Sequence, residues 1–113
     1  MDETLKKQLE ITACKVRLGI LEGVFNAKSG HPGGSLSIAD LLTYLYFAKM
    51  NVYPDKPEEP ERDRLVLSKG HTAPALYATL AEKGFFPKEE LKSLRHIGAM
   101  LQGHPCISIP GVD

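Results

Sequence analysis

The sequence predicts an incomplete α/β fold, in which helices pack on part of a parallel sheet. A long amphipathic helical pattern fills residues 3–28, and a second, almost wholly apolar pattern follows it before residue 50. A short β-prone segment at residues 65–67 then leads through a turn into another helical pattern. A strand followed by a turn and a helix is typical of open α/β sheets. The chain ends without a closing helix or strand, so we expect only part of such a domain.

Composition limits the classes of protein that the chain can belong to. Its 113 residues, 42% of them hydrophobic, are enough for one domain at most. Fourteen basic and fourteen acidic residues give zero net charge, so we expect neither nucleic acid nor a membrane surface as a partner. No apolar run approaches ~18 residues, and the first residues do not resemble a signal peptide, which predicts a cytoplasmic location. Cys14 and Cys106 are too few for a disulfide framework.

The first helix is predicted over about residues 3–28 and has two apolar stripes on opposite sides. The first stripe consists of Leu5, Leu9, Ala13, Val16, Ile20, Val24 and Ala27, and the second of Cys14, Leu18, Leu21 and Phe25. Because an outer helix of a monomer needs only one apolar face, we expect this helix to lie between layers or against another subunit. Gly19 and Gly23 permit a neighbouring element to approach closely.

The second helix is predicted after a possible capping box formed by Ser37 and Asp40. Residues 38–50 leave it almost no polar face, so we expect deep burial. Residues 51–64 combine three prolines with many charges, which predicts a solvated surface loop.

The strand at residues 65–67 ends at a Ser-Lys-Gly-His turn, residues 68–71, before a helix with Pro74 in its first turn and Gly84 just past its end. Open α/β sheets bind ligands at the carboxyl ends of their strands, and the free N–H groups of a helix start favour phosphate. His71 is therefore predicted to meet a phosphorylated ligand. A further helix is predicted over residues 88–97, and His96 within it is interpreted as a surface or locally hydrogen-bonded residue.

Three histidines each lie beside a glycine, in the segments 29–35 (Ser-Gly-His-Pro-Gly-Gly-Ser), 68–71 and 103–105 (Gly-His-Pro). Glycine lets the backbone approach a ligand, and histidine transfers protons near neutral pH, so the three segments predict one polar site. A zinc site that uses His104, Cys106 and a distant histidine is an alternative, but the chain lacks the Cys-x-x-Cys and His-x-x-x-His spacings of such sites. A P-loop is excluded because no Gly-Lys-Ser or Gly-Lys-Thr follows the glycines.

These three segments, in this order and joined by helices of suitable length, closely resemble the amino-terminal region of transketolase over about residues 9–113. The quoted residues are 29–34, the run Asp-Arg-Leu-Val-Leu-Ser-Lys-Gly-His at 63–71, Gly-His-Pro at 103–105 and Pro-Gly-Val at 110–112. Residues 99–102, Ala-Met-Leu-Gln, depart from the Thr-Pro that usually precedes this Gly-His-Pro in single-chain transketolases. In that respect the chain looks more like enzymes split into two polypeptides.

The resemblance implies a thiamine-diphosphate enzyme of the pentose phosphate pathway that moves a two-carbon ketol unit from a ketose phosphate to an aldose phosphate. It implies that His31 handles protons and binds substrate, that His71 contacts the cofactor diphosphate, and that His104 binds the donor's terminal hydroxyl. The family also binds a divalent ion, usually magnesium, through a Gly-Asp-Gly motif that this chain lacks. Residues 1–113 are therefore expected to form the amino-terminal segment of the diphosphate-binding domain, with the metal motif and pyrimidine domain absent.

Two classes of function remain open. The first is an enzyme segment that is inactive alone and works with a carboxy-terminal transketolase chain or domain, in a homodimer or heterotetramer. The second is a non-catalytic remnant or interaction module. An enzyme like 1-deoxyxylulose-5-phosphate synthase is a weaker alternative, because the Leu-Ser-Lys-Gly-His run at residues 67–71 is not expected there.

Overall fold

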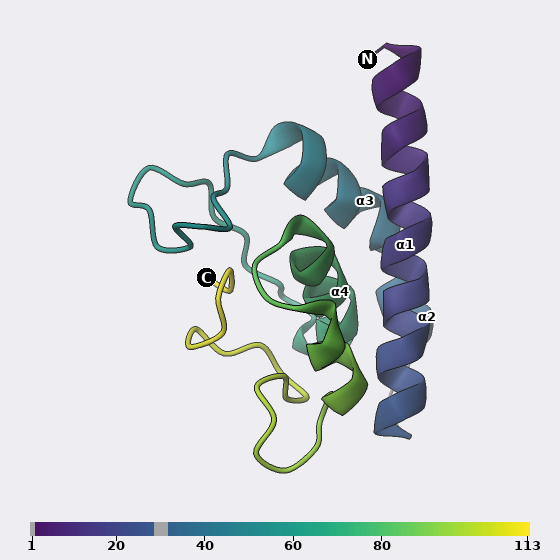
Figure 1. The fold of residues 1–113 in the computed structure, drawn as a ribbon, viewed down its shortest axis with the longest axis vertical. Coiled ribbons are helices and arrows are strands. Elements are labelled where there is room, and N and C mark those ends of the chain that lie inside the picture. The colour runs from purple at the N-terminus through teal and green to yellow at the C-terminus, as the bar shows by residue number, and fades with distance from the viewer. Residues whose placement is uncertain (1, 29–31) are drawn as a thin grey trace.

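The computed structural model describes residues 2–28 and 32–113. Its elements are α1 (Glu3–Ala27), α2 (Pro32–Leu36), α3 (Ala39–Tyr44), η1 (Leu45–Lys49), η2 (Gly70–Thr72), α4 (Ala73–Lys83) and η3 (Lys88–Ser93). The segment η1 is one turn of π-helix, and η2 and η3 are 3-10 helices. Figure 1 shows α1 standing along one edge, with α3, α4 and the C-terminal segment to one side of it.

The helix α1 confirms the first predicted helix almost to the residue. The Asp2 carboxylate accepts a hydrogen bond from the Leu5 N–H at 2.7 Å, which satisfies one of the free donors at the helix start. At the other end, Lys28 adopts the left-handed conformation, with φ 56°, and donates its N–H to the Phe25 carbonyl. The helix therefore begins and ends on local signals.

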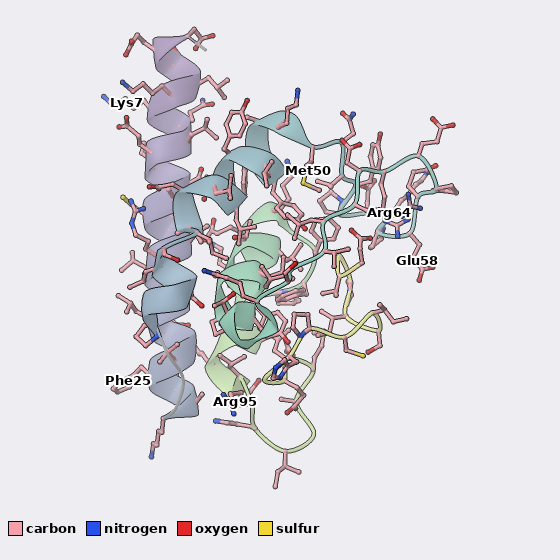
Figure 2. All side chains as sticks on the ribbon, turned by 180° about the vertical axis from the view of Figure 1, so that it is seen from behind. Lys7, Phe25, Met50, Glu58, Arg64 and Arg95 are labelled. Atoms are coloured by element: carbon pink, nitrogen blue, oxygen red, sulfur yellow. The ribbon has the colours of Figure 1, made fainter. Side chains whose placement is uncertain are left out.

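The two apolar stripes of α1 have different surroundings. The central members of the first stripe, Ala13, Val16 and Ile20, are buried, as predicted. The second stripe is exposed in this chain, and Leu18 and Phe25 keep 67% and 80% of their accessible surface. Figure 2 shows Phe25 pointing outward from α1. The expectation that both stripes are covered is thus met on one side only within this chain.

The helix α4 is the centre of the core and confirms the helix predicted after the Ser-Lys-Gly-His turn. Pro74 lies in its first turn, and Gly84 ends it with φ 104°, a conformation that glycine adopts without strain. Close approach of α1 depends on its glycines, because a Cβ at Gly19 would lie 3.1 Å from Ala78 Cβ. Residues from α1, α3, η1 and the segment after α4 complete the core, among them Leu42, Tyr46, Phe85, Leu94, Leu101 and Ile109.

Four predictions about secondary structure or burial are wrong in detail. Residues 65–67 form no strand, nor does any other part of 2–28 and 32–113, and Val66 is 79% exposed; a strand needs partner strands for its backbone hydrogen bonds. The sheet of the predicted α/β fold is therefore not formed within the described chain. The predicted helix over residues 88–97 is the shorter 3-10 helix η3. The second helix is not deeply buried throughout, because Leu41 is 58% exposed and η1 interrupts its α-helical geometry.

The predicted capping box of Ser37 and Asp40, the fourth of these predictions, does not form. Ile38 is the N-cap of α3 and makes no side-chain capping bond. The Ser37 hydroxyl instead donates to the Gly34 carbonyl at 2.8 Å, and the Asp40 carboxylate accepts from Arg17 on α1 at 2.7 Å. An inter-helix ion pair has therefore replaced the local cap.

The loop at residues 51–64 is also more than a solvated surface. Arg62 forms an ion pair with Asp113 at 2.9 Å, and the two side chains keep only 18% and 9% of their accessible surface. Asp113 also accepts a hydrogen bond from the Leu65 N–H at 3.1 Å. Within the described ranges, no helix is long and apolar enough to cross a membrane.

Candidate functional site

The Ser-Lys-Gly-His segment at residues 68–71 forms a tight turn that leads directly into α4. Two groups of Thr72, the backbone N–H and the hydroxyl, donate to the Lys69 carbonyl at 2.9 and 2.7 Å. The Ala73 N–H then donates to the Gly70 carbonyl, which closes the 3-10 turn η2. His71 lies within η2 by its backbone, and its side chain falls outside the described part of the structure.

The segment that follows the first histidine motif is held against this turn. The buried Ser35 hydroxyl, at the end of α2, donates to the Thr72 carbonyl at 3.3 Å. The Lys69 ammonium donates to the Ser37 hydroxyl at 3.2 Å, just after α2. His31 itself lies outside the described residues, immediately before Pro32, the first residue of α2.

The third motif meets the second by direct contact. A Cβ built on Gly70 would lie 2.9 Å from Cδ2 of the His104 ring, closer than real Cβ contacts come. The imidazole of His104 therefore occupies the space that a larger residue at position 70 would need. His104 is otherwise exposed to solvent. Of the three predicted site histidines, the structure thus brings His104 to the turn that contains His71.

The loop that carries His104 is held by its own backbone and by α4. The Arg95 N–H donates to the Leu101 carbonyl at 2.8 Å, which closes the loop. The Arg95 side chain packs over Gly103, where a built Cβ would lie 3.4 Å from its Cζ. Arg95 lies at the end of the molecule where this loop begins (Figure 2). The Tyr77 hydroxyl, from α4, donates to the Gln102 carbonyl at 2.7 Å.

The remaining polar candidates are His96 and Cys106. His96 is exposed, as predicted, and its Nε2 lies 3.2 Å from the Asn26 carbonyl, a partner 70 residues away on α1 and not a local one. Cys106 is exposed, and the Ser108 hydroxyl donates to its sulfur at 3.3 Å, which lowers the pKa of the thiol. Among the side chains that the structure describes, which do not include those of His31 and His71, no three His, Cys, Asp or Glu side chains are grouped as metal ligands. The zinc alternative therefore finds no support in the described chain.

A groove of about 530 Å³ runs between residues 65–70 and residues 104–113, and Ser68, Gly70 and His104 line it. The Lys69 ammonium, the glycine at position 70 and the start of the 11-residue α4 lie at the same turn. A cation and the positive end of a helix dipole both stabilise phosphate. These residues fit the diphosphate of a cofactor.

The sequence did not identify Tyr77 and Ser35 as contributors to this arrangement. A tyrosine within an alanine-rich helix needs a partner for its hydroxyl when it is buried, and this signal was available. The identity of the partner, a carbonyl 25 residues away, was not. The role of Ser35 depends likewise on the fold, because its acceptor is 37 residues away.

Comparison with known proteins defines the class to which this fold and site belong. The family model described as "Transketolase, thiamine diphosphate binding domain" matches residues 8–113. The chain is 50% identical over 105 residues to one of the subunits of the apulose-4-phosphate transketolase of Phocaeicola vulgatus, covering 93% of this chain and 37% of that protein. It is 52% identical over 96 residues to a 6-deoxy-6-sulfo-D-fructose transketolase subunit of a Clostridium species, covering 85% of this chain and 35% of that protein.

Solved transketolase structures have the same fold over this chain. The crystal structure of transketolase from Campylobacter jejuni superimposes with a TM-score of 0.87 at 36% identity, over 99% of this chain and 17% of that one. The chain belongs to the transketolase family, and its match is to the thiamine-diphosphate-binding domain. It spans little more than a third of the length of these two transketolase subunits.

Proposed function

We propose that this chain supplies the diphosphate-facing part of the thiamine diphosphate site of a transketolase. The reaction is transfer of a two-carbon ketol unit from a ketose phosphate to an aldose phosphate. When bound, the cofactor supplies the nucleophilic carbon that this transfer requires. The observation that carries the proposal is the contact of His104 with Gly70, because it joins the expected donor-binding residue to the expected cofactor-binding turn.

Each histidine has a separate role in this proposal. His71 donates a hydrogen bond to a diphosphate oxygen, beside the Lys69 ammonium at the same turn. His31 gives and takes the protons of substrate oxygens as the carbonyl becomes a hydroxyl and the next C–C bond breaks. His104 hydrogen-bonds the terminal hydroxyl of the ketose donor. Its exposure on the groove between residues 65–70 and 104–113 supports a substrate-facing role.

The proposal needs groups from outside these 113 residues. A divalent ion, Mg²⁺ or a similar metal, offsets the diphosphate charge through ligands beyond this chain. A carboxy-terminal transketolase chain or domain completes the site, in a homodimer or heterotetramer, and the subunit naming of the two-chain relatives supports such a partner. We place the complete enzyme in the cytoplasm and in the pentose phosphate pathway, and the isolated chain is inactive.

The test uses the assembled enzyme, this chain together with its remaining part. Three kinds of candidate donor should be tested: common ketose phosphates, apulose 4-phosphate, and 6-deoxy-6-sulfo-D-fructose. The names of the two related transketolase subunits supply the second and third. His31→Ala should lower kcat by about 10²- to 10⁴-fold and leave cofactor affinity unchanged. His71→Ala should weaken thiamine diphosphate by about 1 to 3 kcal/mol, the range for a hydrogen bond to a charged group. His104→Ala should raise the KM of the donor.

His96→Ala is the matched control, because His96 is exposed, its ring lies within hydrogen-bond distance of the Asn26 carbonyl, and its other hydrogen bonds are made by its backbone, which alanine keeps. Its kinetics should equal those of the unmodified enzyme. If His71→Ala leaves cofactor affinity intact while His96→Ala reduces it, the diphosphate has been placed at the wrong turn. An assembled enzyme with no transfer activity on any donor would favour the alternative, a non-catalytic remnant or interaction module. Condensation of pyruvate with an aldose phosphate would favour the 1-deoxyxylulose-5-phosphate synthase alternative.

A further inference from the structure

The loop over residues 95–102, which leads to His104, is a closed unit. Besides the backbone bond from Arg95 to Leu101, the Gln102 side-chain amide donates to two carbonyls, those of His96 and Ala99, at 2.9 Å each. Arg95 and Gly98 both adopt positive φ, 65° and 80°, as residues in tight turns do. The loop therefore closes around the Gln102 amide, and it ends two residues before His104.

A buried tyrosine fixes this closed loop to α4. The Tyr77 side chain is fully buried, and its hydroxyl donates to the Gln102 carbonyl at 2.7 Å. Burial raises the pKa of Tyr77 to about 12, so the phenol keeps its proton, and its ability to donate, at neutral pH. Leu101, one residue earlier than Gln102, is also fully buried. The loop thus meets α4 through one directional hydrogen bond next to an apolar contact.

We propose that Tyr77 and Gln102 are positioning residues that set the place of His104 over the Gly70 turn. Tyr77 lies two helical turns after Gly70, on the continuous segment formed by η2 and α4. This segment therefore holds the His104 loop at two points: the Tyr77 hydroxyl holds Gln102, and the space above Gly70 holds the imidazole. The spacing between donor site and cofactor turn is then set by a helix and not by the loop.

This inference rests on the proposed function, in which His104 binds the ketose donor. Its specific consequence is that loss of the phenol hydrogen bond displaces the donor-binding group and leaves the Gly70–Thr72 turn in place. Tyr77→Phe keeps the aromatic ring and removes only the donating hydroxyl. Gln102→Met keeps the length of the side chain and removes both amide bonds to the loop. A purely structural role would lower stability without favouring one substrate over the other.

The experiment measures donor KM, acceptor KM, kcat and thiamine diphosphate affinity in the assembled enzyme. We expect donor KM to rise about three- to tenfold in Tyr77→Phe and Gln102→Met, as for loss of a net hydrogen bond. The other three quantities should stay within about twofold. Tyr53→Phe, at an exposed tyrosine of the 51–64 loop, is the matched control and should change none of them.

A second readout does not depend on turnover. His104 is exposed, so diethyl pyrocarbonate should modify it, and peptide mapping reports the donor concentration that protects it. The protection midpoint should rise by the same factor as donor KM in both variants. An unchanged midpoint in both would overturn the positioning role. So would equal rises in donor and acceptor KM, which indicate general loosening.

The control that separates this inference from the proposed function is His104→Ala. If His104→Ala leaves donor KM unchanged, the proposed role of His104 is wrong, and the positioning role that depends on it is wrong with it. If His104→Ala raises donor KM but neither Tyr77→Phe nor Gln102→Met does, the positioning role alone is wrong. Should Tyr77→Phe fail to fold, Gln102→Met decides the question, because its side chain is exposed.

Discussion

The substitution Gly70→Ala tests whether His104 and the Ser-Lys-Gly-His turn form one site. The new Cβ would lie 2.9 Å from His104 Cδ2, whereas two carbon atoms in ordinary contact are about 3.5–4.0 Å apart. The ring must therefore move by about 0.6–1.1 Å, the difference between these distances. Gly70 does not have a positive φ, so alanine fits its backbone, and His104 is exposed and can rotate away. We expect stability to change by no more than about 0.5 kcal/mol.

The same displacement should be costly for the reaction. Moving a group that contacts substrate by ~1 Å can cost about 10²-fold in rate, so we expect kcat/KM for the donor to fall about 10- to 100-fold. The assay is steady-state kinetics of the assembled enzyme, with thermal melting to confirm the fold. Gly33→Ala is the control for melting, because a Cβ at Gly33 meets nothing within 4 Å.

A double-mutant cycle identifies the cause. Once His104 is alanine, the ring that a Cβ at position 70 displaces is gone, so Gly70→Ala should cost little in that background. If Gly70→Ala lowers donor kcat/KM equally with and without His104, it acts on the turn itself. That result would refute the reasoning from the Gly70–His104 contact.

Three further predictions follow from the packing. Gly19→Ala should lower the free energy of unfolding by about 0 to 2 kcal/mol, measured by urea unfolding. Overpacking against Ala78 costs ~1–3 kcal/mol, and the better helix propensity of alanine returns ~1 kcal/mol. A clear stabilisation would contradict the close approach of α1 and α4. The Tyr77 pKa of about 12, against an ordinary 10.0, means that its contribution to stability is complete below pH 10 and is lost as pH rises through 12, because the unfolded chain loses the proton first. Burial also raises the pKa of Tyr46, so in unfolding measured from pH 9 to 12 the decline in Tyr77→Phe should be smaller by about 2–3 kcal/mol, and not absent. The isolated chain should self-associate through the exposed stripe that includes Leu18 and Phe25, and sedimentation showing a stable monomer would contradict this interpretation.

The sequence predicted the elements whose ends are marked locally. The ends of α1 match the limits of its apolar pattern, and those of α4 match Pro74 and Gly84. In both helices the hydrogen bonds lie within the element, so a pattern of neighbouring residues is enough to define it. Residues 65–67 differ, because a strand obtains its hydrogen bonds from other strands and none is present in the part of the chain that the structure describes. The predicted capping box failed for a related reason, since Asp40 is paired with Arg17, 23 residues away, and not with its own helix start.

In the candidate site, too, neighbouring residues predict some features, and others depend on partners far away in the sequence. The three glycine-histidine segments predicted one site, and the contact between Gly70 and His104 confirms that two of them meet. The chemical role of each histidine stays a prediction that the family resemblance implies. The hydrogen bonds from Tyr77 and Ser35 span 25 and 37 residues and join groups common in any protein. Their partners depend on how the helices pack, which no local pattern specifies.

The ion pair of Arg62 and Asp113 links the charged loop at residues 51–64 to the candidate site, because Asp113 also lines the groove. Both side chains are mostly buried, so little water can solvate the charge that is left when one partner is removed. Removing either side chain should therefore lower the free energy of unfolding by more than breaking a surface ion pair does. Asp113 also holds the Leu65 N–H, three residues before the Ser-Lys-Gly-His turn. In the absence of strand pairing within the described chain, this carboxylate is what ties residues 62–65 to the segment after His104. The two walls of the groove that Gly70 and His104 line are therefore joined to each other by charge at one end and by the imidazole contact at the other.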